Sequence, residues 1–161
     1  MSRVAALIAS LALVAATGTA ATAATPSGRA VGVRKPSPEA KYAQQAFDAT
    51  NVNRLDNGLA EVRISKCLRK YAVRQARLMA QREQIFHQDL GAPLQACNLT
   101  AAGENVASGY PSGKSVVDDG WMNSDGHRAN ILNPSYRLMA IGAQKGNGGR
   151  WYVAQVFGRK G

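Results

Sequence analysis

The sequence has few of the residue types from which most catalytic and metal sites are built. Its 161 residues include two cysteines and two histidines, and 10 acidic residues stand against 20 basic ones. It contains no glycine-rich phosphate-binding loop, no H-E-x-x-H metal motif and no internal repeat. With 45% hydrophobic and 19% charged residues, the composition is that of an ordinary globular protein, and the length suits one domain.

Past its first residues the chain also lacks an apolar run of the roughly 20 residues that a membrane-spanning helix needs. At its start, Arg3 precedes an almost wholly apolar stretch, residues 4–16, and small residues follow up to an A-x-A site at residues 21–23. This pattern predicts a secretory signal peptide over residues 1–23, with a membrane anchor as the alternative. We therefore expect a secreted, extracellular protein whose mature form has no transmembrane segment.

Export bears on the two cysteines, Cys67 and Cys97. An oxidising compartment lets a pair form and keep a disulfide, so we expect these two to be bonded. Two buried free thiols, or a metal-binding pair, fit an exported chain with two distant cysteines less well. Closing a loop of this length stabilises a fold by about 3 to 4 kcal/mol in the chain-entropy description.

The charge of the chain is strongly one-sided. The formal net charge is +10, and removal of Arg3 with the leader leaves 19 basic and 10 acidic residues, or +9. Such a surface favours anionic partners, which outside a cell are cell-wall polymers or lipid headgroups. The basic residues are spread along the chain without an arginine-rich block, so we expect no nucleic-acid binding. A solvated basic face without a specific partner is the simpler interpretation.

The mature chain divides into a lead-in and one domain. Residues 24–38 are rich in Ala, Thr, Ser, Gly and Pro without an apolar period, which predicts a flexible lead-in before a domain at 39–161. Helical spacing predicts a first helix from Pro38 to Asn57-Gly58. Ser65 can cap a second helix, in which an apolar stripe lies opposite basic residues. The stripe comprises Leu68, Ala72, Ala76, Met79 and Ala80.

The second half of the chain changes character. A third helix is predicted over 114–123, ended by Asp125-Gly126, and a short helical turn follows to Leu132. Apolar runs at 138–143 and 151–157, separated by a glycine-rich turn, predict a β-hairpin. Helices first and strands last indicate an α+β architecture.

In the order and spacing of several segments, the chain resembles the CAP superfamily of cysteine-rich secretory, antigen 5 and pathogenesis-related 1 proteins, and in particular its secreted bacterial (SCP-like) branch. The resemblance runs from about Ala43 to Phe157 and implies a three-layer α-β-α sandwich. Six segments carry it: Asn51-x-x-Arg54 with Gly58-Leu59, Cys67-Leu68 with the apolar stripe, Phe86-His87, Gly103 to Ala107, Trp121 to Ser124 with Gly126 to Leu132, and Tyr152 to Phe157.

The resemblance also implies a cleft lined by histidines and acidic residues, which holds a divalent metal in some family members. His87 and Glu104 match the first histidine and first glutamate of that cleft. Ser124 stands where the family has its second glutamate, and Tyr152 where it has its second histidine. His127 comes from the bacterial Gly-His-Arg segment. We expect these five residues to line one cleft, with Tyr152, Ala154 and Val156 on one face of the last strand.

Two interpretations of the cleft chemistry stay open. His87, His127 and Glu104 could hold a divalent ion such as Zn²⁺, leaving one position for water, or they could form a structural hydrogen-bonded network. Ser124 three residues before His127 suggests a nucleophile and base with Glu104 as orienting acid, although a serine there is more often a helix cap. Asp89 could orient His87 or cap the following turn.

Other singled-out residues have structural interpretations. The aromatic residues Trp121, Tyr110, Trp151 and Phe157 suit the core, and Gly103 and Gly126 suit special backbone geometry beside the cleft.

These observations favour a non-catalytic, monomeric module that binds a ligand or a surface through its cleft and its basic exterior. A metal-assisted hydrolase and a lipid or sterol carrier are the alternatives, since the fold by itself does not determine the function.

Overall fold

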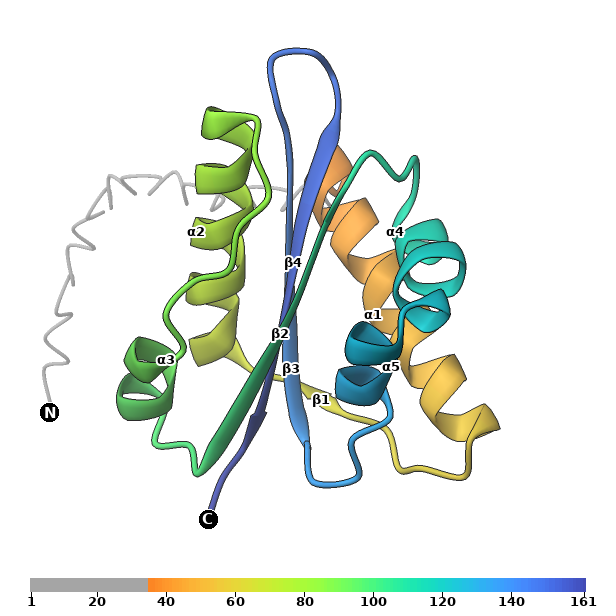
Figure 1. Cartoon of the computed structure of the whole chain (residues 1–161), viewed down its shortest axis with the longest axis vertical. Helices are drawn as coiled ribbons and strands as arrows, with labels where there is room; N and C mark the ends of the chain where they lie inside the picture. Colours follow the sequence, from red (N-terminus) through yellow and green to blue (C-terminus); the bar gives the residue numbers. More distant parts are fainter. Residues whose placement is uncertain (1–34) are drawn as a thin grey trace, which may run out of the picture. The chain divides into compact units, whose positions relative to one another are not determined.

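The computed structural model describes residues 35–161, which form an α-β-α sandwich (Figure 1). The predicted signal peptide, and the lead-in up to residue 34, lie outside the described residues. The central sheet has the strand order β1-β3-β4-β2, with β1 parallel to β3 and the other pairs antiparallel. In Figure 1, helices α2 and α3 lie on one side of the sheet and helices α1, α4 and α5 on the other. The predicted α+β class and the three-layer arrangement are confirmed.

The elements, in chain order, are α1 (Pro38–Asp56), β1 (Arg63–Ile64), α2 (Lys66–Arg82), α3 (Gly91–Ala96), β2 (Ala101–Ser108), α4 (Gly113–Ser115), the π-helical turn η1 (Val116–Gly120), the 3-10 turn η2 (Trp121–Asn123), α5 (Asp125–Ile131), β3 (Leu138–Lys145) and β4 (Trp151–Arg159).

The first two helices form as the sequence predicts. The side chain of Ser37 accepts a hydrogen bond from the Ala40 amide and caps α1, and Ser65 caps α2 in the same way. The whole apolar stripe of α2 is buried against β3 and β4. The predicted hairpin is β3 and β4, and its turn contains Gly149 at φ +75°.

The predicted third helix is wrong as a single regular helix. The chain forms three short pieces there, α4, η1 and η2, in which the Trp121 amide donates to the Val116 carbonyl, five residues back. This wider turn lets Val116, Val117 and Trp121 all point into the core, where each is at most 1% exposed. The Asp125-Gly126 pair does not simply end a helix; it begins α5.

Two motif residues of α1 connect it to distant loops. The fully buried Arg54 guanidinium donates to the carbonyls of Ala60, Ile131 and Asn133. It thereby provides a hydrogen-bond donor for the carbonyl of Ile131, the last residue of α5. Burial lowers the pKa of Arg54. The Asn51 side chain makes two hydrogen bonds to the backbone of Val62 just before β1. The Asn-x-x-Arg pattern therefore has a structural role.

The predicted disulfide is confirmed. Cys67 in the first turn of α2 and Cys97 just after α3 are bonded, with their Cα atoms 5.8 Å apart. Of the predicted core aromatics, Trp121 and Phe157 are buried, and Tyr110 and Trp151 pack against the same cluster half-buried.

Candidate functional site

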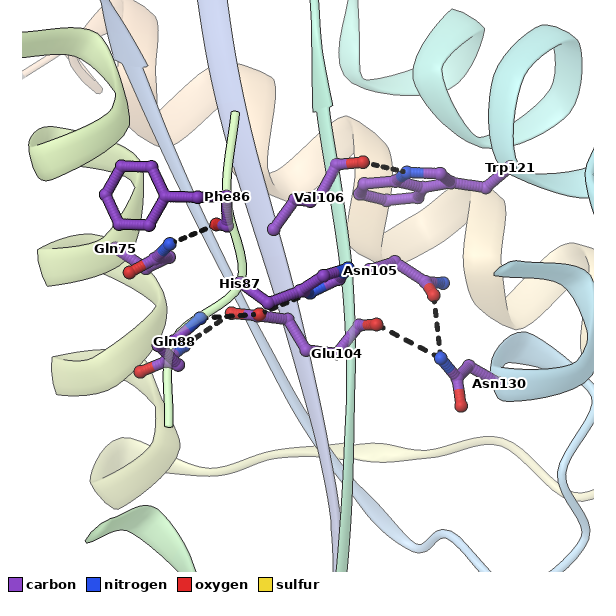
Figure 2. Close-up of polar contacts among 9 residues, drawn as sticks. All are labelled: Gln75, Phe86, His87, Gln88, Glu104, Asn105, Val106, Trp121 and Asn130. Carbon is purple, nitrogen blue, oxygen red and sulfur yellow. Dashed lines mark hydrogen bonds and ion pairs between the residues drawn. The ribbon is translucent and has the colours of Figure 1, made fainter. Parts of the chain in front are cut away.

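The candidate site lies on the sheet edge formed by β2, beside the loop that follows α2. Helix α2 ends at Glu83, whose left-handed backbone (φ +52°) turns the chain back along the sheet. The Gln75 side chain, buried on α2, donates to the Phe86 carbonyl and holds this loop from behind (Figure 2). The loop then carries His87 and Gln88 to β2.

Glu104 is the centre of the polar cluster. Its side chain is 2% exposed. The carboxylate accepts hydrogen bonds from His87 Nδ1 at 2.8 Å, from the Gln88 backbone N–H at 3.1 Å and from the Gln88 side-chain Nε2 at 2.5 Å (Figure 2). These donors compensate the burial of the carboxylate. Gln88 was not predicted, and nothing in the sequence marks it. Gln75 could have been found, because it is a polar residue on the buried side of α2.

His127 lies in the first turn of α5 and contacts Ser124. Its Nδ1 is 2.9 Å from the Ser124 Oγ, which occupies the N-cap position of α5 without accepting a backbone hydrogen bond. Burial lowers the pKa of His127 from its ordinary value of 6.5, and the charge of His87 lowers it further.

A second series of side-chain hydrogen bonds runs through the core behind these residues. Asn130 Nδ2 donates to the carbonyl of Glu104 and to Asn105 Oδ1, and Asn105 Nδ2 donates to the His127 carbonyl and to Gln155. Gln155 donates in turn to Thr50 on α1. This chain of hydrogen bonds links α5, β2, β4 and α1, and it fixes the backbone beneath His127.

The glycine predictions have different outcomes. A Cβ on Gly103 would lie 2.5 Å from the Tyr136 hydroxyl and 2.9 Å from Asn130 Oδ1, so any larger residue here would force both side chains to shift. A Cβ on Gly126 would meet nothing within 4 Å, and its φ is not positive. The expectation that Gly126 serves a special backbone geometry is therefore wrong.

The metal interpretation does not fit this geometry. Among residues 35–161, no three side chains of His, Cys, Asp or Glu are grouped so that they could hold a metal ion. Both Glu104 oxygens already accept hydrogen bonds from the 87–88 loop. The residues therefore match the hydrogen-bonded network better than a three-ligand zinc centre.

The nucleophile interpretation is incomplete for a related reason. Glu104 contacts His87 and not His127, so no carboxylate in the described part of the chain orients the Ser124–His127 pair.

Asp89 accepts from the Gly91 amide at 2.8 Å and so caps the turn before α3. Tyr152 is 3% exposed and packs with Met79, Ala80 and Val106 on the α2 side of the sheet. Its predicted place on a cleft wall stays a prediction.

Comparison with known proteins identifies the class to which this fold and polar cluster belong. The sequence model of the Cysteine-rich secretory protein family, CAP, matches residues 47–157. The chain is 33% identical over 114 residues to the uncharacterized protein YkwD of Bacillus subtilis and 31% identical over 121 residues to the uncharacterized membrane protein YlbC of the same species. These alignments cover 66% and 71% of this chain but 44% and 33% of the relatives. The chain thus spans less than half of their length.

Solved structures agree. An extracellular protein containing an SCP domain from Bacillus anthracis matches with a TM-score of 0.65 and 27% identity over 79% of this chain and 45% of that chain. A cysteine-rich secretory protein from Staphylococcus aureus matches with a TM-score of 0.67 and 23% identity over 79% and 41% of the two chains. An outer surface protein of Borrelia burgdorferi matches with a TM-score of 0.64 and 20% identity over 73% and 92%. The chain belongs to the CAP family.

Proposed function

We propose that this protein is a secreted CAP module that binds an anionic ligand or surface without chemical turnover. Two proteins of similar structure are described as an extracellular protein and an outer surface protein, and the sequence begins with a signal-peptide pattern. In the described part of the chain, no helix has the length and apolar character needed to cross a bilayer.

The basic outer face of α2 is the observation that carries the proposal. Helix α2 contains six basic residues and no acidic one, and all six are exposed: Lys66, Arg69, Lys70, Arg74, Arg77 and Arg82. None of them forms an ion pair within residues 35–161. Lys66, Lys70, Arg74 and Arg77 follow one another around successive turns and cover about 17 Å of the helix. This array suits repeated phosphodiester groups, which occur both in wall polymers and in anionic lipids.

The predicted cleft is the second region through which we expect the protein to contact its ligand. The His87 side chain is 61% exposed, so its ring is accessible beside the buried Glu104. The hydrolase alternative lacks a complete metal or triad arrangement. The lipid-carrier alternative gains no support from the groove of about 490 Å³ beside α1 and η1, because Asp48, Asp56 and Asp118 line it.

Co-sedimentation with vesicles and with an insoluble wall polymer tests the proposal. We expect binding to vesicles of equal parts phosphatidylglycerol and phosphatidylcholine, or to phosphate-rich wall polymer, and none to phosphatidylcholine alone. The Lys70→Glu/Arg74→Glu variant should bind at least tenfold more weakly, since each basic residue near an anionic surface contributes about 1 kcal/mol. Preference for lipid or polymer distinguishes the two sources.

The matched control is Arg150→Glu/Lys160→Glu, which changes the net charge equally at two other exposed positions. It should weaken binding less than threefold. Equal losses in the two variants would show that only net charge matters, and absence of binding to every anionic material would refute the proposed function.

A further inference from the structure

The outer edge of β3 is paired along only a small part of its length. Strand β1 pairs with β3 at two positions, Arg63 with Leu138 and Ile64 with Met139. The Ser65 amide donates to the Met139 carbonyl, and the chain then turns away into α2. Strand β3 continues to Lys145, so its residues from 140 onward have no strand neighbour on this side within the described chain.

Backbone polar groups point outward along this unpaired stretch. The carbonyl of Met139 faces β1, and since backbone direction alternates along a strand, Ile141 and Ala143 direct their N–H and C=O groups to the same side. None of these four groups has a hydrogen-bond partner among residues 35–161. Ile141 is 6% and Ala143 7% exposed, so these groups, which have no partner in residues 35–161, belong to nearly buried residues. Such groups normally find partners.

A groove runs along the same edge between α1 and α2, which flank the sheet in Figure 1. It consists of three adjoining hollows of about 150, 270 and 260 Å³. The first two share Ile141 and Arg69, and the last two share Gln144 and Arg77. The groove therefore leads from the end of β1 at Ile64 to the β3–β4 turn.

The two walls of the groove differ in chemistry. On the α1 side it is lined by the small side chains of Ala40 and Ala43 and, at the start of the helix, by Ser37 and Glu39. The Glu39 carboxylate forms no ion pair with either arginine of the opposite wall. On the α2 side the exposed Arg69 and Arg77 stand on either side of Val73, and neither pairs with a carboxylate in residues 35–161. Arg69 and Arg77 are eight residues apart, or about 12 Å along the helix. Two strand residues four positions apart are separated by about 13 Å and point to the same face.

We propose that this groove binds an extended acidic peptide, which pairs with Ile141 and Ala143 as an added strand beyond β1. Main-chain hydrogen bonds to the β3 edge supply affinity, and acidic side chains at positions i and i+4 of the peptide meet Arg69 and Arg77. The intervening side chains point to the alanine wall of α1. The first acidic residue of this chain is Glu39, so the segment that precedes α1 has no carboxylate with which to complement the two arginines.

The test uses the full chain and the peptide acetyl-Gly-Asp-Val-Thr-Val-Asp-Gly-amide. We expect saturable binding in fluorescence anisotropy with a labelled peptide, and at least tenfold slower hydrogen exchange of the Ile141 and Ala143 amides at saturation. Two altered peptides test the contacts while the protein stays the same. In one, both aspartates are replaced by lysine, and in the other, the central threonine and both valines are N-methylated. Each should bind at least tenfold more weakly. Arg69→Glu/Arg77→Glu should have the same effect, with folding checked by circular dichroism.

Lys70→Glu/Arg74→Glu is the matched control, because these two residues lie on α2 outside the groove. It should change peptide affinity less than threefold, although it should weaken the proposed polyanion binding at least tenfold, so the two proposals can fail separately. Equal losses in both double variants would overturn the inference, as would saturation without protection of Ile141 and Ala143. Amides at these positions already as slow as those of β4 without peptide would mean that another segment or a second copy covers the edge, and would also overturn it.

Discussion

Glu104→Ala offers a direct test of whether the His–Glu cluster holds the loop after α2 against the sheet. The substitution removes three hydrogen bonds to a buried carboxylate and leaves the Gln88 amide without its partner. Each hydrogen bond to a charged group contributes roughly 1.5 to 3 kcal/mol, but His87 is largely exposed and can return to water. The net loss should therefore be about 2 to 4 kcal/mol in the free energy of unfolding.

Glu104→Gln should be much milder for a geometric reason. The new amide nitrogen can take the place of Oε1, and the Gln88 side-chain amide can rotate to present its oxygen. His87 Nδ1 and the Gln88 amide then keep an acceptor at Oε2. Only the contribution of the charge is lost, so we expect a decrease of about 1 kcal/mol.

Urea unfolding at neutral pH, followed by tryptophan fluorescence, measures both variants. Trypsin cleavage after Arg82, where the loop begins, gives a local readout and should accelerate for the alanine variant under native conditions. Glu61→Ala, which removes an exposed carboxylate, is the control and should stay within about 0.5 kcal/mol of the original protein. The reasoning is refuted if Glu104→Ala behaves like this control, or if the glutamine variant is as unstable as the alanine variant.

Three further predictions concern protonation, the disulfide and metal. The pKa of His127 is lowered from 6.5 in the folded protein, so the unfolded chain binds a proton at this imidazole more readily. The free energy of unfolding should therefore fall as the pH drops below about 6.5, and it should fall less in His127→Asn. Urea titrations across this pH range measure both. An undiminished fall in that variant would contradict the assignment. Cys67→Ser/Cys97→Ser should lose about 3 to 4 kcal/mol in the same assay and become insensitive to reductant, whereas continued sensitivity would place the effect elsewhere. Dialysis against EDTA should leave the melting temperature unchanged and zinc at background; a fall restored by Zn²⁺ would contradict the hydrogen-bonded interpretation of Glu104.

Local rules were sufficient for the regular elements of the fold. The caps at Ser37 and Ser65, the buried stripe of α2 and the glycine-rich turn between β3 and β4 each depend on residues close together in the sequence. The region around Val116 could not be predicted this way. Its π-helical turn is selected by burial of three large side chains at once, which is a property of the packed core.

The candidate site was predictable in part. The resemblance to the CAP family placed His87 and Glu104 correctly as neighbours, and the spacing of Ser124 and His127 matched one helical turn. The hydrogen-bond partners could not be read in advance, because Gln88 reaches Glu104 only once the loop folds back from Glu83. Whether a carboxylate binds a metal or serves as a structural acceptor depends on such partners, which pattern and composition do not contain.

The two edges of the sheet differ in whether their outward backbone groups have hydrogen-bond partners, and this contrast supports a functional role for the β3 edge. On the β2 edge, Asn130 Nδ2 donates to the Glu104 carbonyl and the Trp121 indole donates to the Val106 carbonyl, so side chains occupy the outward backbone acceptors (Figure 2). The β3 edge has no equivalent donors beyond Met139 in residues 35–161, although Ile141 and Ala143 are as buried as the residues of β2. Proteins usually protect an open strand edge against pairing. Here residues of α1 and α2 line the hollows along the edge on both sides, so the backbone groups lie in a groove and not on a flat, exposed edge. In this sheet, side chains occupy acceptors on the β2 edge, whereas the groove-lined β3 edge has no partner within residues 35–161; this arrangement is expected if the β3 edge binds a peptide.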